Sequence, residues 1–175
     1  MDDDNANPNA PREPQQPERE EDAGGMEIGD FILVVVGAHL RAEMADRPLA
    51  YQLCQRIGDW LQQHNDLLQI DLVPIVCSDI WYVNQETLQQ RPTISIGGPG
   101  VNALSAYWWT QKKINTAVVQ DDKMVIQLDP EFIDLRVSIW GMDHDLTVKA
   151  LDIFCEKYLA DYLKAVATQV EPEVD

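Results

Sequence analysis

Residues 92–110 read PTISIGGPGVNALSAYWWT and contain three structural signals in succession. Residues 93–96 are typical of a short buried strand, and the glycines and proline at 97–100 end it. Residues 101–112 then predict a helix. A glycine-rich turn that leads into a helix presents backbone N–H groups at the helix N-terminus, where the helix dipole favours anions. This turn is the strongest indication of a binding site in the chain.

The rest of the folded region alternates strands and helices. Strands are predicted at 31–36, 67–76 and 135–140, a hairpin at 116–120 and 124–128, a helix at 48–64, a helical turn near 84–88, and one last helix along the apolar stripe 151–166. The run FILVVV at 31–36 is apolar throughout, as expected for a strand buried on both faces of a parallel sheet. Pro48 fits the first position of a helix. Pro74 places its strand at a sheet edge or a bulge, and Asp143 or Asp145 is expected to cap the last helix.

This order of elements predicts a three-layer, Rossmann-like α/β domain over residues 29–167. Its sheet is expected to be mostly parallel, with an antiparallel hairpin near one edge. Residues 1–28 are proline-rich and hold nine acidic residues against two arginines, so we expect a disordered acidic tail. Residues 168–175 are predicted to be a flexible C-terminus.

The composition argues against several classes of function. The chain has 175 residues and a formal net charge of −17, which argues against nucleic-acid partners and against binding to anionic membranes. It contains no apolar run of about 18 residues that would cross a bilayer, and the acidic start lacks the pattern of a secretory signal. The three cysteines have no metal-binding spacing. We therefore predict a cytoplasmic protein without a metal site.

Loops that follow the predicted strands are expected to form the site. In a parallel sheet these loops emerge at one edge, where α/β proteins bind ligands. The residues expected to bind a small anionic ligand are Gly97, Gly98, Gly100, Asn102 and Arg41. The candidates for catalysis are His39, Asp79 and Asp143.

Each of these candidates also has a structural interpretation. The glycines fit a tight turn, and Asp143 fits a helix cap. Arg41 and Arg47 are either anion ligands or members of surface ion pairs with Glu43 or Asp46. The aromatic side chains of Trp81, Tyr107, Trp108 and Trp109 predict an interface between copies of the chain.

The pattern Gly98-x-Gly100-x-x-Ala103 partly matches the dinucleotide-binding turn, and Asp121 follows at about the spacing of a ribose-binding acid. Pro99 removes one N–H donor from that turn, and a hairpin surrounds Asp121. A dinucleotide is therefore the weaker interpretation, and no cofactor is expected.

Two segments resemble known modules. ISIGGPGVNALSAY, from residue 94, is similar to the GGPxxN strand–turn–helix of archaeal surface-layer proteins, and WGMDHDLTVKALDIF, from residue 140, is similar to its companion motif. The clostridial cell-wall-binding repeat has a similar pair. The resemblance covers about 30 residues and implies an α/β module for assembly or wall binding, with no catalytic residues to transfer.

Two hypotheses of function follow. The first is an α/β binding or assembly module with a small-ligand site at the glycine-rich loops. The second is a transferase or hydrolase that acts on a nucleotide or another small phosphorylated substrate.

Overall fold

The computed structural model describes residues 30–68, 71–111, 117–121 and 123–169. The predicted tail at 1–28 lies outside the described residues. The elements are β1 (Phe31–Val36), α1 (Leu40–Gln63), β2 (Val73–Ser78), α2 (Asp79–Val83), β3 (Thr93–Ile96), α3 (Ala103–Gln111), β4 (Ala117–Asp121), β5 (Met124–Leu128), β6 (Arg136–Gly141), α4 (His144–Lys157) and α5 (Leu159–Gln169). Two short 3₁₀ turns cover Asn65–Leu67 and Leu88–Gln90.

These strands form one sheet in the order β2-β1-β3-β6-β5-β4. Strands β1, β2, β3 and β6 are parallel to one another. Strand β5 is antiparallel to β6, and β4 is antiparallel to β5. The predicted mostly parallel sheet, with an antiparallel hairpin at one edge, is confirmed.

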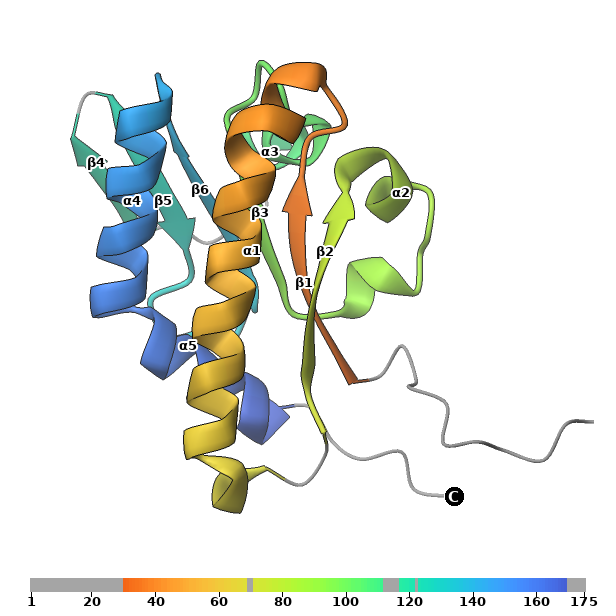
Figure 1. Ribbon diagram of the computed structural model, residues 1–175, viewed down its shortest axis with the longest axis vertical. Helices are drawn as coiled ribbons and strands as arrows, with labels where there is room; N and C mark the ends of the chain where they lie inside the picture. The colour runs from red at the N-terminus through yellow and green to blue at the C-terminus, as the bar shows by residue number, and fades with distance from the viewer. Residues whose placement is uncertain (1–29, 69–70, 112–116, 122, 170–175) are drawn as a thin grey trace, which may run out of the picture.

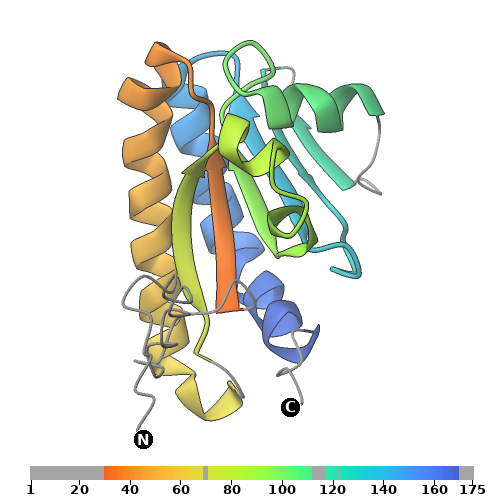
Figure 2. The ribbon, with the colours of Figure 1, turned by 90° about the vertical axis from the view of Figure 1, so that its right-hand side faces the viewer.

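Helices cover both faces of this sheet, which gives three layers (Figures 1 and 2). Helices α1, α4 and α5 lie on one face, and α2 and α3 lie on the other. Strand β1 serves both layers: Ile32, Val34 and Val36 belong to the larger core under α1 and α4, whereas Leu33 and Val35 belong to the smaller core under α2 and α3. This alternation explains why the β1 sequence is apolar at every position.

Helix α1 begins at Leu40, eight residues before the predicted start at Pro48, so that prediction was wrong. His39 occupies the N-cap position, where its Nδ1 accepts a hydrogen bond from the Arg41 N–H at 3.2 Å. Pro48 is exposed inside the helix. The long apolar stripe of α1, which packs on the sheet, outweighs the one backbone hydrogen bond that a proline removes.

Strand β2 begins at Val73, whereas the prediction began at residue 67; Asn65–Leu67 form a 3₁₀ turn. Its position at the edge of the sheet, predicted from Pro74, is confirmed. Helix α2 directly follows β2, so the helical turn expected near 84–88 occurs earlier, with a 3₁₀ turn at Leu88–Gln90.

The last apolar stripe forms two helices, not one. Helix α4 ends at Lys157, and the chain changes direction at Tyr158 before α5 (Figure 1). The change of direction brings Tyr162 into the core, where its hydroxyl donates to the Leu135 carbonyl at 3.1 Å. Helix α5 continues to Gln169, so residues 168 and 169, predicted to be flexible, are helical.

Candidate functional site

The carboxyl ends of the four parallel strands meet at one edge of the sheet, at the end where α1 begins (Figure 1). The loops that follow β1, β2, β3 and β6 therefore emerge together, as the sequence predicted. The chain continues from β1 through α1 to β2, which lies on one side of β1, and then to β3, which lies on the other side. The point between the ends of β1 and β3 is thus the switch in strand order, where ligands of open α/β sheets usually bind.

In this protein the chain itself fills the crevice between β1 and β3. A Cβ atom on Gly37 would lie 1.8 Å from the Val101 carbonyl oxygen, so the loop after β3 packs directly against the backbone after β1. The Asn102 side-chain amide also donates to the Val35 carbonyl at 3.4 Å. Gly37 is therefore required by close backbone packing.

Asp79 connects three segments at this edge. Its Oδ1 accepts from the N–H groups of Ala38 at 2.8 Å and of Ile80 at 2.7 Å, and its Oδ2 accepts from the Ala103 N–H at 2.7 Å. The side chain is buried, with 3% of its surface exposed. Its carboxylate lies at the N-terminus of α3, the position where a bound anion would interact with the helix dipole.

Asn102 caps the same helix. Its Oδ1 accepts from the N–H groups of Leu104 at 3.0 Å and Ser105 at 3.3 Å, and its Nδ2 donates to Ser95 Oγ and the Ile96 carbonyl. The first N–H groups of α3 thus have partners within the chain. An anion at the glycine-rich turn would have to displace Asp79, so the observed geometry gives Asn102 and Asp79 structural roles.

Several other residues named from the sequence have structural roles. His39 is an exposed helix cap. Arg47 pairs with Glu43 through two hydrogen bonds of 2.6 and 2.8 Å, which confirms the surface ion pair considered for it. Asp143 caps α4 by accepting from the Leu146 N–H at 2.9 Å, which confirms the expected cap.

A pocket of about 290 Å³ lies beside the filled crevice, between the first turns of α1 and the loops after β3 and β6. It is lined by Arg41, Ala45, Asp46, Gly98, Val101, Gly141, Met142, Asp143, His144 and Thr147. Three residues predicted for the site, Arg41, Gly98 and Asp143, are among them. We call this cavity the α1–β6 pocket.

Asp46 and His144 also line this pocket and were not among the residues predicted for the site. Asp46 is only 6% exposed as a residue, and its carboxylate, which is open to the pocket, accepts no hydrogen bond from the described residues. Burial raises the pKa of Asp46, and the charge of His144 partly offsets this effect. Its Oδ2 lies 2.4 Å from where a Cβ on Gly97 would be, and Gly97 has φ of +101°. Gly97 is thus required both by its conformation and by Asp46.

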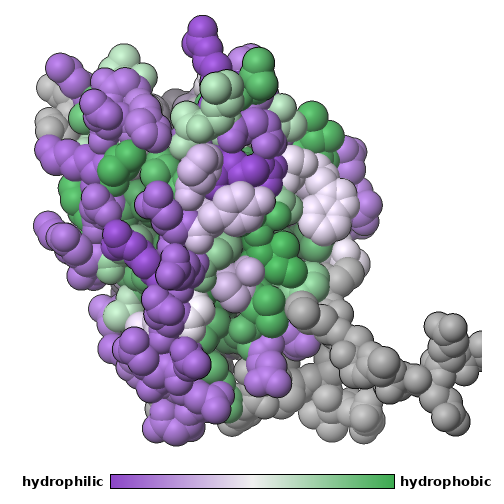
Figure 3. Space-filling view, in the orientation of Figure 1, coloured by the Kyte–Doolittle hydropathy of each residue, from purple (hydrophilic) through white to green (hydrophobic). Residues whose placement is uncertain are grey.

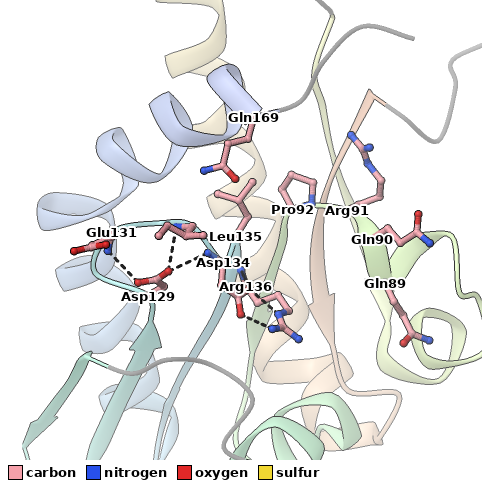
Figure 4. A pocket seen from close by; sticks show the side chains of 11 residues that line it. Gln89, Gln90, Arg91, Pro92, Asp129, Glu131, Asp134, Leu135, Arg136 and Gln169 are labelled. Carbon is pink, nitrogen blue, oxygen red and sulfur yellow. Dashed lines mark hydrogen bonds and ion pairs between the residues drawn. The ribbon is translucent and has the colours of Figure 1, made fainter.

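Other cavities lie away from this edge. The largest of them, of about 660 Å³, is at the opposite end of β3 and β6. Figure 4 shows Asp129, Asp134 and Arg136 engaged in interactions within the chain there. There Asp129 accepts three backbone N–H groups, which lowers its pKa, and Arg136 pairs with Asp134. A smaller cavity of about 330 Å³ lies between α2 and α3.

Some of the aromatic residues predicted to form an interface between copies of the chain are exposed. On α2 and α3 the exposed large apolar side chains are Ile80, Trp81, Val83, Tyr107 and Trp109, whereas Trp108 is buried and unavailable to a partner. Figure 3 shows hydrophilic residues over much of α1 and α4, with apolar residues grouped beside α1 toward β2. The described residues therefore retain three of the four aromatic side chains expected at an interface.

The dinucleotide interpretation has a geometric difficulty. In that class of site the ribose-binding acid follows a strand next to the glycine-rich one. Here β4, which ends at Asp121, is separated from β3 by β6 and β5. As for metals, the described ranges contain no group of three His, Cys, Asp or Glu side chains placed to hold an ion.

No family model matches the chain, and no curated protein is significantly similar to it. Among the helices of the described residues, none combines the length and the apolar character needed to cross a membrane.

Proposed function

We propose that this protein is an α/β binding module and that the α1–β6 pocket is its small-ligand site. The observation that carries the proposal is the Asp46 carboxylate. It lines this pocket on a residue that is only 6% exposed, and it accepts no hydrogen bond from the described residues. A buried, unpaired carboxylate costs folding free energy, so natural proteins retain one mainly where it has a function.

The position of the pocket supports the same conclusion. It opens at the carboxyl edge of parallel strands, beside the switch in strand order, where open α/β sheets bind ligands. Gly98 and Gly141 form part of its wall.

A ligand screen on the full chain tests this proposal. Amide chemical shifts would be recorded by NMR against panels of nucleotides, sugar phosphates, amino acids, amines and organic acids. We expect one class to shift the resonances around Asp46 and His144, and Asp46→Asn to weaken that binding. Asp59→Asn is the matched control, because Asp59 is exposed on the same helix. If no class shifts these resonances, the proposal is wrong.

An enzyme is the second candidate, and one observation favours it. Asp46, with its raised pKa, lies near His144, and two titratable groups in one pocket suit general acid–base chemistry. A transferase or hydrolase acting on a small phosphorylated substrate is the reaction class we consider. Turnover that Asp46→Asn abolishes while binding persists would favour the enzyme over the module.

The proposal includes self-association of the protein. The exposed aromatic residues of α2 and α3 support self-association, which light scattering after size exclusion would measure as a concentration-dependent mass. The similarity to surface-layer and wall-binding modules supports an assembly role as well.

The free thiols of Cys54, Cys77 and Cys155 are consistent with a reducing compartment, and we infer the cytoplasm.

A further inference from the structure

The α1–β6 pocket carries opposite charges at two depths. Asp46 is its buried group, with 6% of the residue exposed. Arg41, Asp143 and His144 also line the pocket, and all three are exposed. A negative charge therefore lies inside the pocket, and Arg41 supplies a positive charge at its mouth. The Asp143 carboxylate at the mouth accepts a hydrogen bond from the Leu146 N–H as the cap of α4.

A ligand of one sign fits this arrangement poorly. An anion would approach the Asp46 carboxylate, and the N–H groups at the start of α3 that would attract it are bonded to Asp79 and Asn102. A simple cation would pair with Asp46 but would have to pass the positive charge of Arg41. A molecule with both charges satisfies both ends of the pocket.

The small size of the pocket and its apolar walls limit the class of ligand further. Arg41, Asp46 and His144 line one small cavity, so the groups that would pair with the ligand are close together. The ligand's own two charges must then be separated by few bonds. Ala45, Val101 and Met142 supply apolar wall, and the cavity of about 290 Å³ admits only a small molecule.

We propose that the α1–β6 pocket binds a small zwitterion of the α-amino-acid type. The ammonium group of the ligand pairs with Asp46, its carboxylate pairs with His144 and Arg41, and its side chain contacts Ala45, Val101 and Met142. This inference rests on the proposed function, because it names the ligand class of the same site.

The test compares whole amino acids with molecules that lack one of the two charges. The twenty standard L-amino acids would be titrated into the full chain by NMR, followed by calorimetry for those that bind. For valine the matched probes are isobutylamine, which lacks the carboxylate, and isovalerate, which lacks the ammonium. We expect at least one amino acid to bind, and each of its half-molecules to bind about tenfold or more weakly, because each loses a charge-assisted pair.

Variants locate the two charges. Asp46→Asn should weaken the amino acid about tenfold or more and leave the carboxylic acid probe unaffected or improved. Arg41→Gln should weaken the amino acid and the carboxylic acid probe, and leave the amine unaffected. Because Arg41 is exposed, this variant keeps the test valid even if Asp46→Asn perturbs folding. Asp59→Asn should bind like the unchanged protein.

The outcomes separate this inference from the proposed function. If no amino acid binds but another molecule shifts the resonances around Asp46, the zwitterion inference is overturned and the small-ligand site stands. If no molecule of any class does so, both are overturned. Amino-acid binding that Asp46→Asn and Arg41→Gln leave unchanged would also overturn the inference.

Discussion

Replacement of Asp79 tests whether its carboxylate holds the site edge together or is available for chemistry. Asp79→Ala removes the acceptor of three backbone N–H groups, two on Oδ1 and one on Oδ2. A hydrogen bond to a charged acceptor contributes about 1.5–3 kcal/mol. Because Ala38 and Ala103 are exposed residues, water can replace part of this contribution. We therefore expect Asp79→Ala to lower the free energy of unfolding by about 2–4 kcal/mol.

Asp79→Asn refines the test. An asparagine keeps one oxygen for Ala38 and Ile80, but it turns an NH₂ group toward the Ala103 N–H, so one of the three bonds becomes a donor–donor contact. We expect a loss of about 1–2 kcal/mol, smaller than for alanine.

Urea unfolding measured by circular dichroism would give both values, provided that the dependence on urea is unchanged. Asp59→Asn, the exposed control on α1, should lie within about 0.5 kcal/mol of the unchanged protein. If Asp79→Ala also lies within that range, the carboxylate does not tie the loops together. That result would refute the structural role and return Asp79 to the candidates for catalysis.

Three further predictions concern the pocket and the core. Burial raises the pKa of Asp46, so its protonated form is favoured in the folded protein. The resulting contribution to the free energy of unfolding is fully present below the ordinary pKa of 3.8 and is lost as the pH rises through the folded-state pKa. Asp46→Asn should therefore stabilise the protein by about 0.5–2 kcal/mol at pH 7 in urea unfolding, with no gain below the ordinary pKa. Gly97→Ala should cost about 1–3 kcal/mol, because its φ is positive and Asp46 occupies the Cβ position, whereas Gly100→Ala, with open space around it, should be neutral in thermal melting. Burial raises the pKa of Cys77 to about 11 and of Cys54 to about 12, so both thiols should react with a disulfide reagent at pH 8 far more slowly in the native protein than in urea.

The sheet was largely predictable from the sequence because its strands carry strong local signals. The apolar run at 31–36 indicated a strand with both faces covered, and each face of β1 indeed packs in a different core. Pro74 indicated an edge, since a proline cannot donate in the middle of a sheet. The short hairpin spacing indicated antiparallel pairing for β4 and β5.

The start of α1 was not predictable in the same way, and Asp46 was missed for that reason. Histidine is a weak helix-capping signal, whereas proline at a first helical position is a strong one, so Pro48 was taken as the start. Once the helix begins at Leu40, Asp46 falls on its buried stripe, four residues after Ala42 and three before Leu49. A charged residue on an apolar stripe is a readable signal of a site, but only with the correct helix boundary.

A sequence pattern that falls at the carboxyl ends of parallel strands need not bind the ligand, as the residues at the switch in strand order show. The glycine-rich turn, Asp79 and Asn102 all follow strands at the edge where ligands bind, as predicted. The pattern does not reveal whether a carboxylate there faces a ligand or a backbone N–H, and in this fold Asp79 meets the N–H groups of Ala38 and Ala103. The crevice is closed by its own chain. Among the described residues at this edge, Asp46, between α1 and the end of β6, is the largely buried residue whose carboxylate has no hydrogen-bond partner. Asp79 and Asn102 occupy the N–H groups at the start of α3 that would otherwise bind an anion. The ligand group that fits this edge is therefore one that pairs with the negative charge of Asp46.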